Sequence, residues 1–190
     1  MIEKVAALVT RDVRGGRELL VFDHPLEGGG VSVQLPSGTV EPGERPADAV
    51  LRELAEETGL RGVTLIVELD RFSPLAPDER VTVAASGTDG VRIARGETVR
   101  LRSERGGVAW VVTASGQEAR VIRELLTSEV TRFLFHLRAP ATGAATWTAR
   151  CDCGAPLEYY WVPIEQARLD ALQQQWLDRV RERLAGAGGA

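Results

Sequence analysis

The sequence has few of the residues that mark several protein classes. Its 190 residues include only two cysteines and one lysine. Two cysteines cannot build a disulfide framework, so a disulfide-stapled secreted domain is not expected. No apolar run approaches the roughly 18 residues that a membrane helix needs. The first residues also lack the basic start and the long apolar stretch of a signal peptide. We therefore expect a cytoplasmic protein with no membrane partner.

The rest of the composition is that of an ordinary globular domain. Hydrophobic residues make up 44% and charged residues 26% of the chain, which favours neither disorder nor a fibre. The formal net charge of −4 gives no overall attraction to nucleic acid or anionic membranes. A small-molecule partner is therefore favoured over a nucleic acid. The length fits one domain, or one domain with a sizeable insertion.

The first part of the chain predicts strands around one helix. Apolar runs and alternation predict strands at residues 4–10, 18–22, 31–35 and 63–69, the first two as a hairpin. A helix is predicted between Pro46, which suits a first turn, and Gly59, which suits a C-terminal stop. Apolar residues recur in it at spacings of three and four, which indicates one buried face. That face comprises Ala47, Val50, Leu51 and Leu54.

The later part of the chain predicts short strands separated by turns, and two helices. Strands are predicted at residues 79–86, 90–94, 98–102, 108–113, 131–138 and 158–162. Residues 117–126 predict a helix, with Ser115 as its cap. Residues 165–184 predict a closing amphipathic helix. The glycine- and alanine-rich end, residues 185–190, predicts a disordered tail.

Three carboxylates are placed together by the helix period. Glu53, Glu56 and Glu57 stand at positions i, i+3 and i+4, which places them on one helical face. A solvated surface helix would tolerate their repulsion, so a purely structural interpretation is open. The preceding Ser37 and Gly38 let the backbone bend close to that face. Carboxylate and backbone carbonyl oxygens are the ligands that Mg²⁺ prefers, so a magnesium site is the functional alternative.

Residues 38–60 resemble the Nudix box, whose pattern is G-x5-E-x7-R-E-U-x-E-E-x-G-U with U apolar. Every fixed position is present, and Leu54 and Leu60 occupy the apolar positions. The fixed residues are Gly38, Glu44, Arg52, Glu53, Glu56, Glu57 and Gly59. One departure is Ser37, where many members carry glycine. That position contributes mainly a backbone carbonyl, so the change is expected to be tolerated.

The resemblance spans residues 1–72 and 130–184 and implies an α/β/α sandwich with a mixed sheet. It also implies a pyrophosphohydrolase that cleaves the diphosphate bond of a nucleoside diphosphate derivative or nucleotide with Mg²⁺, or with Mn²⁺ in its place. By this resemblance the metal ligands are Glu53, Glu56 and Glu57, with a carbonyl from Ser37 or Gly38. Glu44 and Arg52 would position those ligands, and Glu53 and Glu57 would act in catalysis. The general base is Glu53 or a glutamate of a later loop: Glu79, Glu97, Glu104 or Glu118.

The chain is longer than a minimal Nudix domain, so residues 1–184 predict a single domain with a β-rich insertion at about 73–128. We expect substrate choice to lie there. The 23 basic residues include one lysine and therefore 22 arginines, of which six fall in residues 80–105. They are Arg80, Arg92, Arg95, Arg100, Arg102 and Arg105. They predict either a solvated hairpin edge or a flap that grips phosphate.

Other interpretations stay open from the sequence. A binding or sensor module could keep the fold without turnover. An isomerase acting on an isoprenoid diphosphate would need a reactive cysteine near the metal, and Cys151 and Cys153 come late in the chain. The two cysteines have neither a second cysteine pair nor a nearby histidine in the sequence, which argues against a zinc site. His136 is expected in the core, and sheet packing is expected of the late aromatic residues, Tyr159, Tyr160 and Trp161. The substrate and a homodimeric state are not decided.

Overall fold

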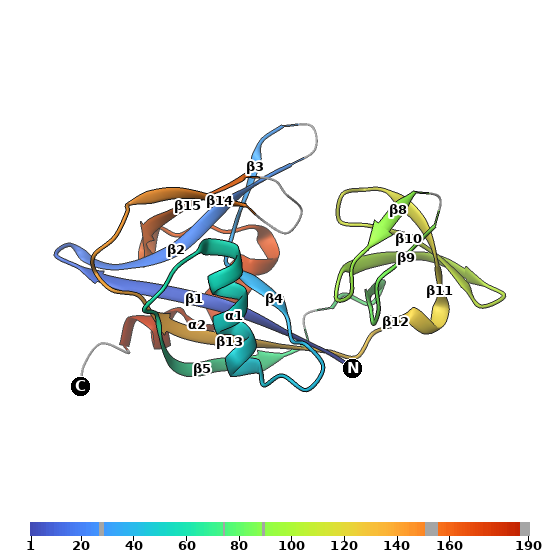
Figure 1. Ribbon diagram of the computed structural model, residues 1–190, viewed down its shortest axis with the longest axis horizontal. Coiled ribbons are helices and arrows are strands. Elements are labelled where there is room, and N and C mark those ends of the chain that lie inside the picture. The colour runs from blue at the N-terminus through green and yellow to red at the C-terminus, as the bar shows by residue number, and fades with distance from the viewer. Residues whose placement is uncertain (27–28, 74, 89, 151–155, 187–190) are drawn as a thin grey trace. The chain divides into compact units, whose positions relative to one another are not determined.

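A computed structural model describes residues 1–26, 29–73, 75–88, 90–150 and 156–186. Within these ranges the chain forms two compact units (Figure 1). The larger unit consists of Val5–Arg71 and the chain from Phe133 onward, and the smaller unit consists of Met1–Lys4 and Phe72–Arg132. None of the helices in the described ranges is long and apolar enough to cross a membrane.

The larger unit is built on a mixed eight-stranded sheet with the order β14-β15-β2-β1-β13-β5, in which β3 pairs with β2 and β4 with β1. The predicted hairpin is confirmed, because β1 and β2 pair antiparallel up to the turn between Val13 and Gly16. Strands β4 and β14 were not predicted. The strands are β1 (Ile2–Val13), β2 (Gly16–Pro25), β3 (Val31–Gln34), β4 (Ser37–Thr39), β5 (Thr64–Phe72), β13 (Val130–Arg138), β14 (Thr146–Arg150) and β15 (Pro156–Pro163).

Two helices cover the two faces of this sheet, α1 (Pro46–Thr58) in front and α2 (Ala171–Gly186) behind (Figure 1). Strand β1 is therefore buried on both faces, as its apolar run predicted. The odd-numbered Val5, Ala7 and Val9 pack in the cluster that holds the apolar side of α1. This layering confirms the predicted α/β fold class.

The buried face of α1 differs slightly from the prediction. Val50, Leu54 and Thr58, four residues apart, form its centre, and Ala49 completes it. Leu51 was predicted on this face, but it lies about 100° around the helix axis from Val50 and is 37% exposed. The helix ends as predicted, since Gly59 takes the left-handed conformation with φ 71° and donates its N–H to the Ala55 carbonyl.

The closing helix begins later than predicted. Residues Ile164–Gln166 form a separate 3₁₀ turn, η2, and α2 starts at Ala171. Asp170 explains the start, because its carboxylate accepts the Gln173 N–H at 2.8 Å, as an N-cap does. The helix continues through Gly186, two residues into the predicted tail. Residues 187–190, like Cys151 and Cys153, lie outside the described residues.

The smaller unit contains a five-stranded sheet with the order β11-β10-β9-β6-β12 and a two-stranded sheet of β7 and β8. Among its described residues, one hydrophobic cluster holds seven buried residues: Ile93, Val99, Ala109, Val111, Ala119, Val121 and Leu126. The strands are β6 (Glu79–Thr82), β7 (Ser86–Thr88), β8 (Val91–Ile93), β9 (Thr98–Arg105), β10 (Val108–Val112), β11 (Glu118–Ile122) and β12 (Leu126–Thr127). The predicted insertion falls within this unit, and its status as an insertion stays a prediction.

The helix predicted at residues 117–126 is wrong. The segment forms β11, a 3₁₀ turn η1 (Arg123–Leu125) and β12. Burial alternates along β11, with Ala119 and Val121 buried and their neighbours exposed, which is the strand period. Ser115 caps no helix; it lies in the turn that the bond from the Thr113 N–H to the Gln117 carbonyl closes at 2.9 Å.

His136 is fully buried on β13, which confirms it as a core residue. Its Nε2 lies 2.8 Å from the Thr10 hydroxyl oxygen. The pKa of its imidazole is lowered to about 4, mainly by burial. The Arg17 and Arg138 guanidinium groups also lower this pKa, and the Asp12 carboxylate only partly offsets them. Between about pH 4 and pH 6.5 His136 therefore stays neutral in the folded protein, whereas in the unfolded chain it becomes protonated once the pH falls below its ordinary pKa of about 6.5.

This depressed pKa predicts acid-sensitive stability. Stability is fully present above about pH 6.5 and decreases as the pH falls towards about 4. Between pH 7 and pH 4.5 the loss from this group should be roughly 2–3 kcal/mol. Urea unfolding at both pH values should show a smaller loss for His136→Gln than for the wild type. Equal losses in the two proteins would contradict the assignment.

Candidate active site

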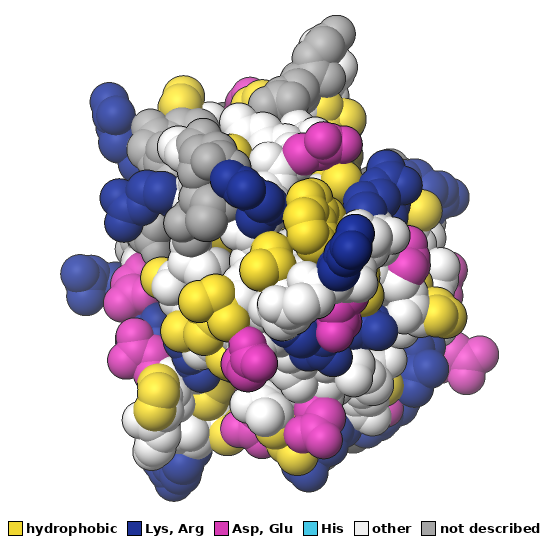
Figure 2. Space-filling view, turned by 90° about the vertical axis from the view of Figure 1, so that its right-hand side faces the viewer, with side chains coloured by type: hydrophobic (Ala, Val, Ile, Leu, Met, Phe, Trp, Pro, Cys, Tyr) yellow, Lys and Arg dark blue, Asp and Glu magenta, His cyan; other side chains and the backbone are white. Residues whose placement is uncertain are grey.

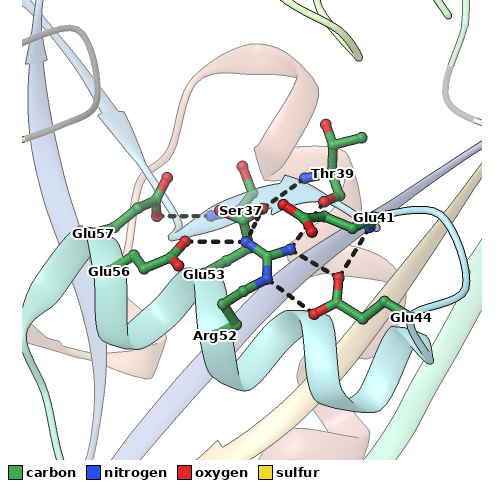
Figure 3. A network of polar contacts seen from close by, with 8 residues as sticks. All are labelled: Ser37, Thr39, Glu41, Glu44, Arg52, Glu53, Glu56 and Glu57. Atoms are coloured by element: carbon green, nitrogen blue, oxygen red, sulfur yellow. Dashed lines mark hydrogen bonds and ion pairs between the residues drawn. The ribbon is translucent and has the colours of Figure 1, made fainter.

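The site is formed where β4 runs beside α1. The Ala7 N–H on β1 binds the Pro36 carbonyl at 2.8 Å, which anchors the start of β4 on the sheet. The connection to α1 turns at Gly43, whose φ of 82° favours glycine. Pro46 then opens the helix. This geometry brings the backbone of β4 against the carboxylates of α1 (Figure 3).

Arg52 is the centre of the polar network (Figure 3). Its Nε and Nη2 donate to the two Glu44 carboxylate oxygens, each at 2.9 Å, in a bidentate pair. Its Nη1 lies 3.0 Å from both Glu56 Oε2 and Glu53 Oε1. Nη2 also donates to the Thr39 carbonyl at 3.2 Å. One cation therefore links three box carboxylates with β4.

The backbone of β4 fixes two of the carboxylates directly. The Thr39 N–H donates to Glu53 Oε1 and the Ser37 N–H donates to Glu57 Oε2, both at 3.1 Å. Gly38 lies between them, and a Cβ at Gly38 would lie 1.9 Å from Glu53 Cδ. The Glu53 carboxylate therefore occupies the space that a side chain at position 38 would need.

The carboxylates around Arg52 differ in their proton affinity. Burial raises the pKa of Glu53, although Arg52 and the Thr39 N–H act against it. Hydrogen bonds from Arg52 lower the pKa of Glu44. The Glu53 side chain is 15% exposed and the Glu56 side chain 52%. Glu44 therefore stays ionised as the partner of Arg52, whereas Glu53 is the better proton acceptor.

The box residues provide oxygen donors for the metal that the box implies. Within the described residues, no three carboxylate, imidazole or thiol groups converge closely enough to hold a metal ion as they stand. Arg52 lies between Glu53 and Glu56 instead. The chemistry of the donors nevertheless fits a hard cation, because carboxylate and backbone oxygens meet here. A carboxylate has about four lone-pair positions, so one or two hydrogen bonds leave it able to bind a metal.

The structure brings most of the predicted site residues together. Glu44, Arg52, Glu53 and Glu56 share one network, and Glu57 binds the neighbouring backbone. Thr39 was not predicted, and it contributes both of its backbone groups. No side-chain signal could have identified it, because backbone N–H and C=O groups are the same at every residue except proline.

The four alternative general bases all belong to the smaller unit. Glu79 accepts the Ala76 N–H at 2.9 Å, and Glu97 accepts the Ala94 N–H at 3.0 Å. Glu104 pairs with Arg123 at 2.8 Å. These three therefore have structural partners, and Glu118 is exposed on β11. Glu53 is the one base candidate placed within the Arg52 network.

Aromatic side chains of β14 and β15 pack together, and one of them, Tyr159, is electrostatically coupled to Glu57. Tyr159 is fully buried, and its hydroxyl has no hydrogen-bond partner among the described residues. Burial and the Glu57 carboxylate raise the pKa of Tyr159. Trp147 stacks on its ring at a centroid distance of 5.6 Å and donates its Nε1–H to the Thr58 carbonyl. Packing in the sheet is confirmed for Tyr159.

A hollow of about 250 Å³ lies at the C-terminal end of α1. Trp147 and Trp161 contribute aromatic walls, and Thr58 and Gly59 belong to the helix end. The Arg11 guanidinium lies 4.5 Å from the centroid of the Trp161 ring. Arg11 also pairs with Glu18 at 2.7 Å, so the hollow offers flat rings beside an ion pair, which suit a planar aromatic group.

Removing the central cation should destabilise the fold. Arg52→Gln leaves Glu44 and Glu53 in positions where their side chains are only 17% and 15% exposed. We expect a loss of roughly 1–3 kcal/mol in urea unfolding. The matched control is Arg45→Gln, because Arg45 forms an exposed pair with Asp48 and exposed pairs contribute little. Equal effects of the two substitutions would contradict the central role of Arg52.

Comparison with known proteins identifies the family. The family model of the NUDIX domain matches residues 3–111. The chain belongs to the Nudix family. The match contains the whole box and continues to β10. It confirms the resemblance drawn from residues 38–60. The sequence predicted that the first matching stretch would end at about residue 72, and the family match extends further, to residue 111.

Two curated relatives match this Nudix chain over a short stretch. An RNA pyrophosphohydrolase of Bartonella bacilliformis is 44% identical over 67 residues, which cover 35% of this chain and 39% of that protein. An RNA pyrophosphohydrolase of Brucella anthropi is 38% identical over 56 residues, which cover 30% and 32%. The chain thus spans less than half the length of these relatives.

Two solved structures resemble the Nudix chain over nearly all of its length. The M. smegmatis Nudix hydrolase RenU aligns with a TM-score of 0.55 at 16% identity, covering 96% of this chain and 85% of that one. The binary complex of a C. elegans Ap4A hydrolase aligns with a TM-score of 0.54 at 13% identity, covering 98% and 99%. At these identities the likeness shows the fold alone.

Proposed function

We propose that this protein hydrolyses the diphosphate bond of a nucleoside diphosphate derivative or nucleotide, with Mg²⁺ as cofactor and Mn²⁺ able to replace it. The observation that carries the proposal is the complete box, assembled around Arg52 and clamped by the backbone of β4. A surface helix with no function would not need two of its carboxylates bonded to a neighbouring strand.

The chain's residues have distinct roles in the proposed reaction. Attack of water at phosphorus needs charge neutralisation and in-line positioning more than covalent help. Glu53, Glu56 and Glu57, with a carbonyl of Ser37 or Gly38, would hold the cation. When bound, Mg²⁺ polarises the phosphoryl oxygens and lowers the pKa of the attacking water.

The remaining residues orient groups and accept a proton. Glu44 holds Arg52 in a bidentate pair, and Arg52 in turn orients Glu53 and Glu56. Glu53 would accept the proton of water, since a raised pKa suits a general base near neutral pH. Substitution of Glu44 should therefore act through Arg52 and the orientation of Glu53, without removing a ligand of the metal.

The non-reacting part of the substrate is assigned to the hollow at the end of α1. Trp147 and Trp161 offer flat faces for a nucleobase, and Arg11, which pairs with Glu18, lies beside the Trp161 ring. The similar proteins named above include RNA pyrophosphohydrolases and an Ap4A hydrolase. Their names define a range of nucleoside-linked phosphate anhydrides to test. The low cysteine content supports a cytoplasmic location.

The domain organisation belongs to the same proposal. We infer that residues 1–184 form one Nudix domain and that residues 73–128 are a β-rich insertion in it. Two observations support the inference. The segment has its own buried core, and it belongs to the smaller unit.

A substrate screen tests the proposed activity. The protein is incubated with Mg²⁺ or Mn²⁺ and a panel of ADP-ribose, diadenosine tetraphosphate, nucleoside triphosphates and 5′-triphosphorylated RNA. Phosphate is read after coupling to phosphatase for ADP-ribose and diadenosine tetraphosphate, and after coupling to pyrophosphatase for the triphosphates. We expect at least one compound to be hydrolysed, EDTA to abolish the reaction and Mg²⁺ to restore it.

A nucleotide sensor on the same fold is the alternative. The position of Arg52 among the carboxylates favours it, because the cation there already neutralises Glu53 and Glu56. Calorimetry separates the two functions. Tight nucleotide binding without Mg²⁺, combined with no product after long incubation, would overturn the hydrolase proposal.

A further inference from the structure

A buried hydrogen bond joins α2 to the chain that leads into β4. Gln173 is only 6% exposed, and its Oε1 accepts the N–H of the fully buried Leu35 at 2.6 Å. The outer surface is less distinctive: on the face that Figure 2 shows, dark blue basic side chains lie among magenta carboxylates. Mixed charges favour no partner of one sign, whereas a buried donor that loses its acceptor is costly. The Leu35 N–H therefore depends on Gln173.

Gln173 occupies a helix position at which the side chain usually serves its own helix. Asp170 caps α2, because its carboxylate accepts the Gln173 N–H at 2.8 Å. Gln173 is thus the third residue of the helix, where glutamine normally accepts the N–H of the cap residue and completes a capping box. In α2 the Asp170 N–H instead donates to the Val33 carbonyl at 2.9 Å. Both groups that would close the box are therefore turned towards the chain before β4.

The first turn of α2 holds the chain before β4 in the manner of a pairing strand. It offers the N–H of the cap residue to the Val33 carbonyl and Gln173 Oε1 to the Leu35 N–H. The next residue is held from the sheet, because the Pro36 carbonyl accepts the Ala7 N–H of β1 at 2.8 Å. Leu35 and Pro36 are therefore fixed by α2 and β1 together.

The held residues come directly before the two backbone groups that bind carboxylates of the site. The Ser37 N–H donates to Glu57. The Thr39 N–H donates to Glu53. Ser37 is two residues beyond Leu35, about 7 Å along an extended chain. The proline between them has a fixed φ, so a shift at Leu35 is passed on to Ser37.

We propose that Gln173 is a positioning residue for the metal site. By holding Leu35 it fixes β4, and β4 in turn orients the Glu53 and Glu57 carboxylates. The inference rests on the proposed function, since it concerns the same site. It gives α2, which covers the other face of the sheet, a role that residues 38–60 do not contain. Gln173 acts through the backbone of β4 and contacts neither the metal nor the substrate.

A purely structural role of Gln173 is the competing interpretation. Gln173 would then only fasten α2 to the sheet, and its loss would lower stability without disturbing the carboxylates. Val180 provides the matched comparison, because it lies on the same helix and is 1% exposed. Its side chain has no polar atom. Val180→Ala therefore lowers stability through a cavity and leaves the hydrogen bonds to the chain before β4 in place.

The test measures Mn²⁺ binding without substrate, by electron paramagnetic resonance of the free ion, so it does not depend on turnover. Gln173→Met keeps the length of the side chain and removes the acceptor, and it should weaken Mn²⁺ binding by roughly tenfold or more. Gln173→Glu keeps an acceptor oxygen and should bind closer to the wild type. Gln175→Met is the control for the replacement itself, because Gln175 is exposed on the same helix. It should bind Mn²⁺ as the wild type does.

Urea unfolding of each variant separates stability from metal affinity. If Gln173→Met does not fold, Gln173→Asn replaces it, since the shorter side chain draws the acceptor away from Leu35, and the same weakening is expected. The role of Gln173 is overturned if Gln173→Met binds Mn²⁺ as tightly as the wild type, if Gln173→Glu binds as weakly as Gln173→Met, or if Val180→Ala weakens binding equally.

The same measurements distinguish this inference from the proposed function. A wild type that binds Mn²⁺ but hydrolyses no compound of the panel would contradict the proposed function, and weaker binding by Gln173→Met would still support the positioning role. A wild type that hydrolyses its substrate, with Gln173→Met matching it in Mn²⁺ binding, would contradict the positioning role alone. A wild type that does not bind Mn²⁺ at millimolar concentrations would overturn both.

Discussion

Glu57→Gln is expected to lower the rate of hydrolysis by about a hundredfold or more at saturating substrate. The amide keeps the size of the side chain and an oxygen that can still accept the Ser37 N–H. It removes one negative charge of the proposed metal site. Charge stabilisation by a bound metal contributes several kcal/mol to phosphoryl transfer, and each 1.4 kcal/mol is about tenfold in rate.

The measurement is kcat and KM for the substrate found in the screen, repeated over a range of Mg²⁺ concentrations. A loss of metal ligation should raise the Mg²⁺ concentration at half-maximal rate, which a purely structural role would not do. The matched control is Glu182→Gln, an exposed glutamate of α2 that loses the same charge. If Glu57→Gln hydrolyses the substrate as fast as the wild type, the metal-site assignment is wrong.

The α1 part of the site was predictable because its signal lies in side chains at helical spacing. Once a helix begins at Pro46, the period of 3.6 residues places Glu53, Glu56 and Glu57 on one face. The family pattern added Glu44 and Arg52, and the structure places both in the network. The β4 part was not predictable in detail, since its contribution is backbone N–H and C=O groups.

The errors in the fold come from local propensity competing with strand pairing. Residues 117–126 contain alanine, arginine, glutamate and leucine, all good helix formers. Pairing of Glu118–Ile122 with β10 buries Ala119 and Val121 instead. That gain depends on a second strand, so it is not contained in the segment itself. Strand β14 was missed although its five residues, Thr146–Arg150, alternate polar and apolar side chains.

In the smaller unit, the number of arginines in the sequence did not predict where each arginine lies. The sequence indicated an arginine-rich stretch at residues 80–105 and left open whether it is a solvated edge or a phosphate-binding flap. The structure divides the set. Arg100 pairs with Asp78 at 3.5 Å. Arg102 is instead the extra residue of a bulge in the pairing of β9 with β10, and it lines a hollow of about 440 Å³. A one-residue shift in strand pairing decides which face of the sheet a side chain occupies, and the composition of the segment does not predict such a shift.

Gly38→Ala is expected to reduce activity much more than stability. The new Cβ would lie 1.9 Å from Glu53 Cδ and 2.3 Å from each Glu53 carboxylate oxygen. These atoms are the mobile end of a side chain, so the carboxylate can swing away and the backbone can stay in place. Glu53 then loses its bonds to Thr39 and Arg52. Since a displacement of about 1 Å can cost about a hundredfold in rate, we expect a loss of that order.

Gly15→Ala is the control for the glycine replacement itself, because a Cβ at Gly15 meets nothing within 4 Å. Unfolding by urea should show a loss of only about 1–2 kcal/mol for Gly38→Ala, in the range of ordinary point mutations. A double-mutant cycle with Glu53→Ala isolates the cause. If the collision with Glu53 is responsible, Gly38→Ala should lower the thermal midpoint in the wild type and leave it nearly unchanged when Glu53 is already alanine. An equal decrease in both backgrounds would show that glycine is needed at position 38 for its backbone, and the close approach of Glu53 would then be a consequence of the site rather than its determinant.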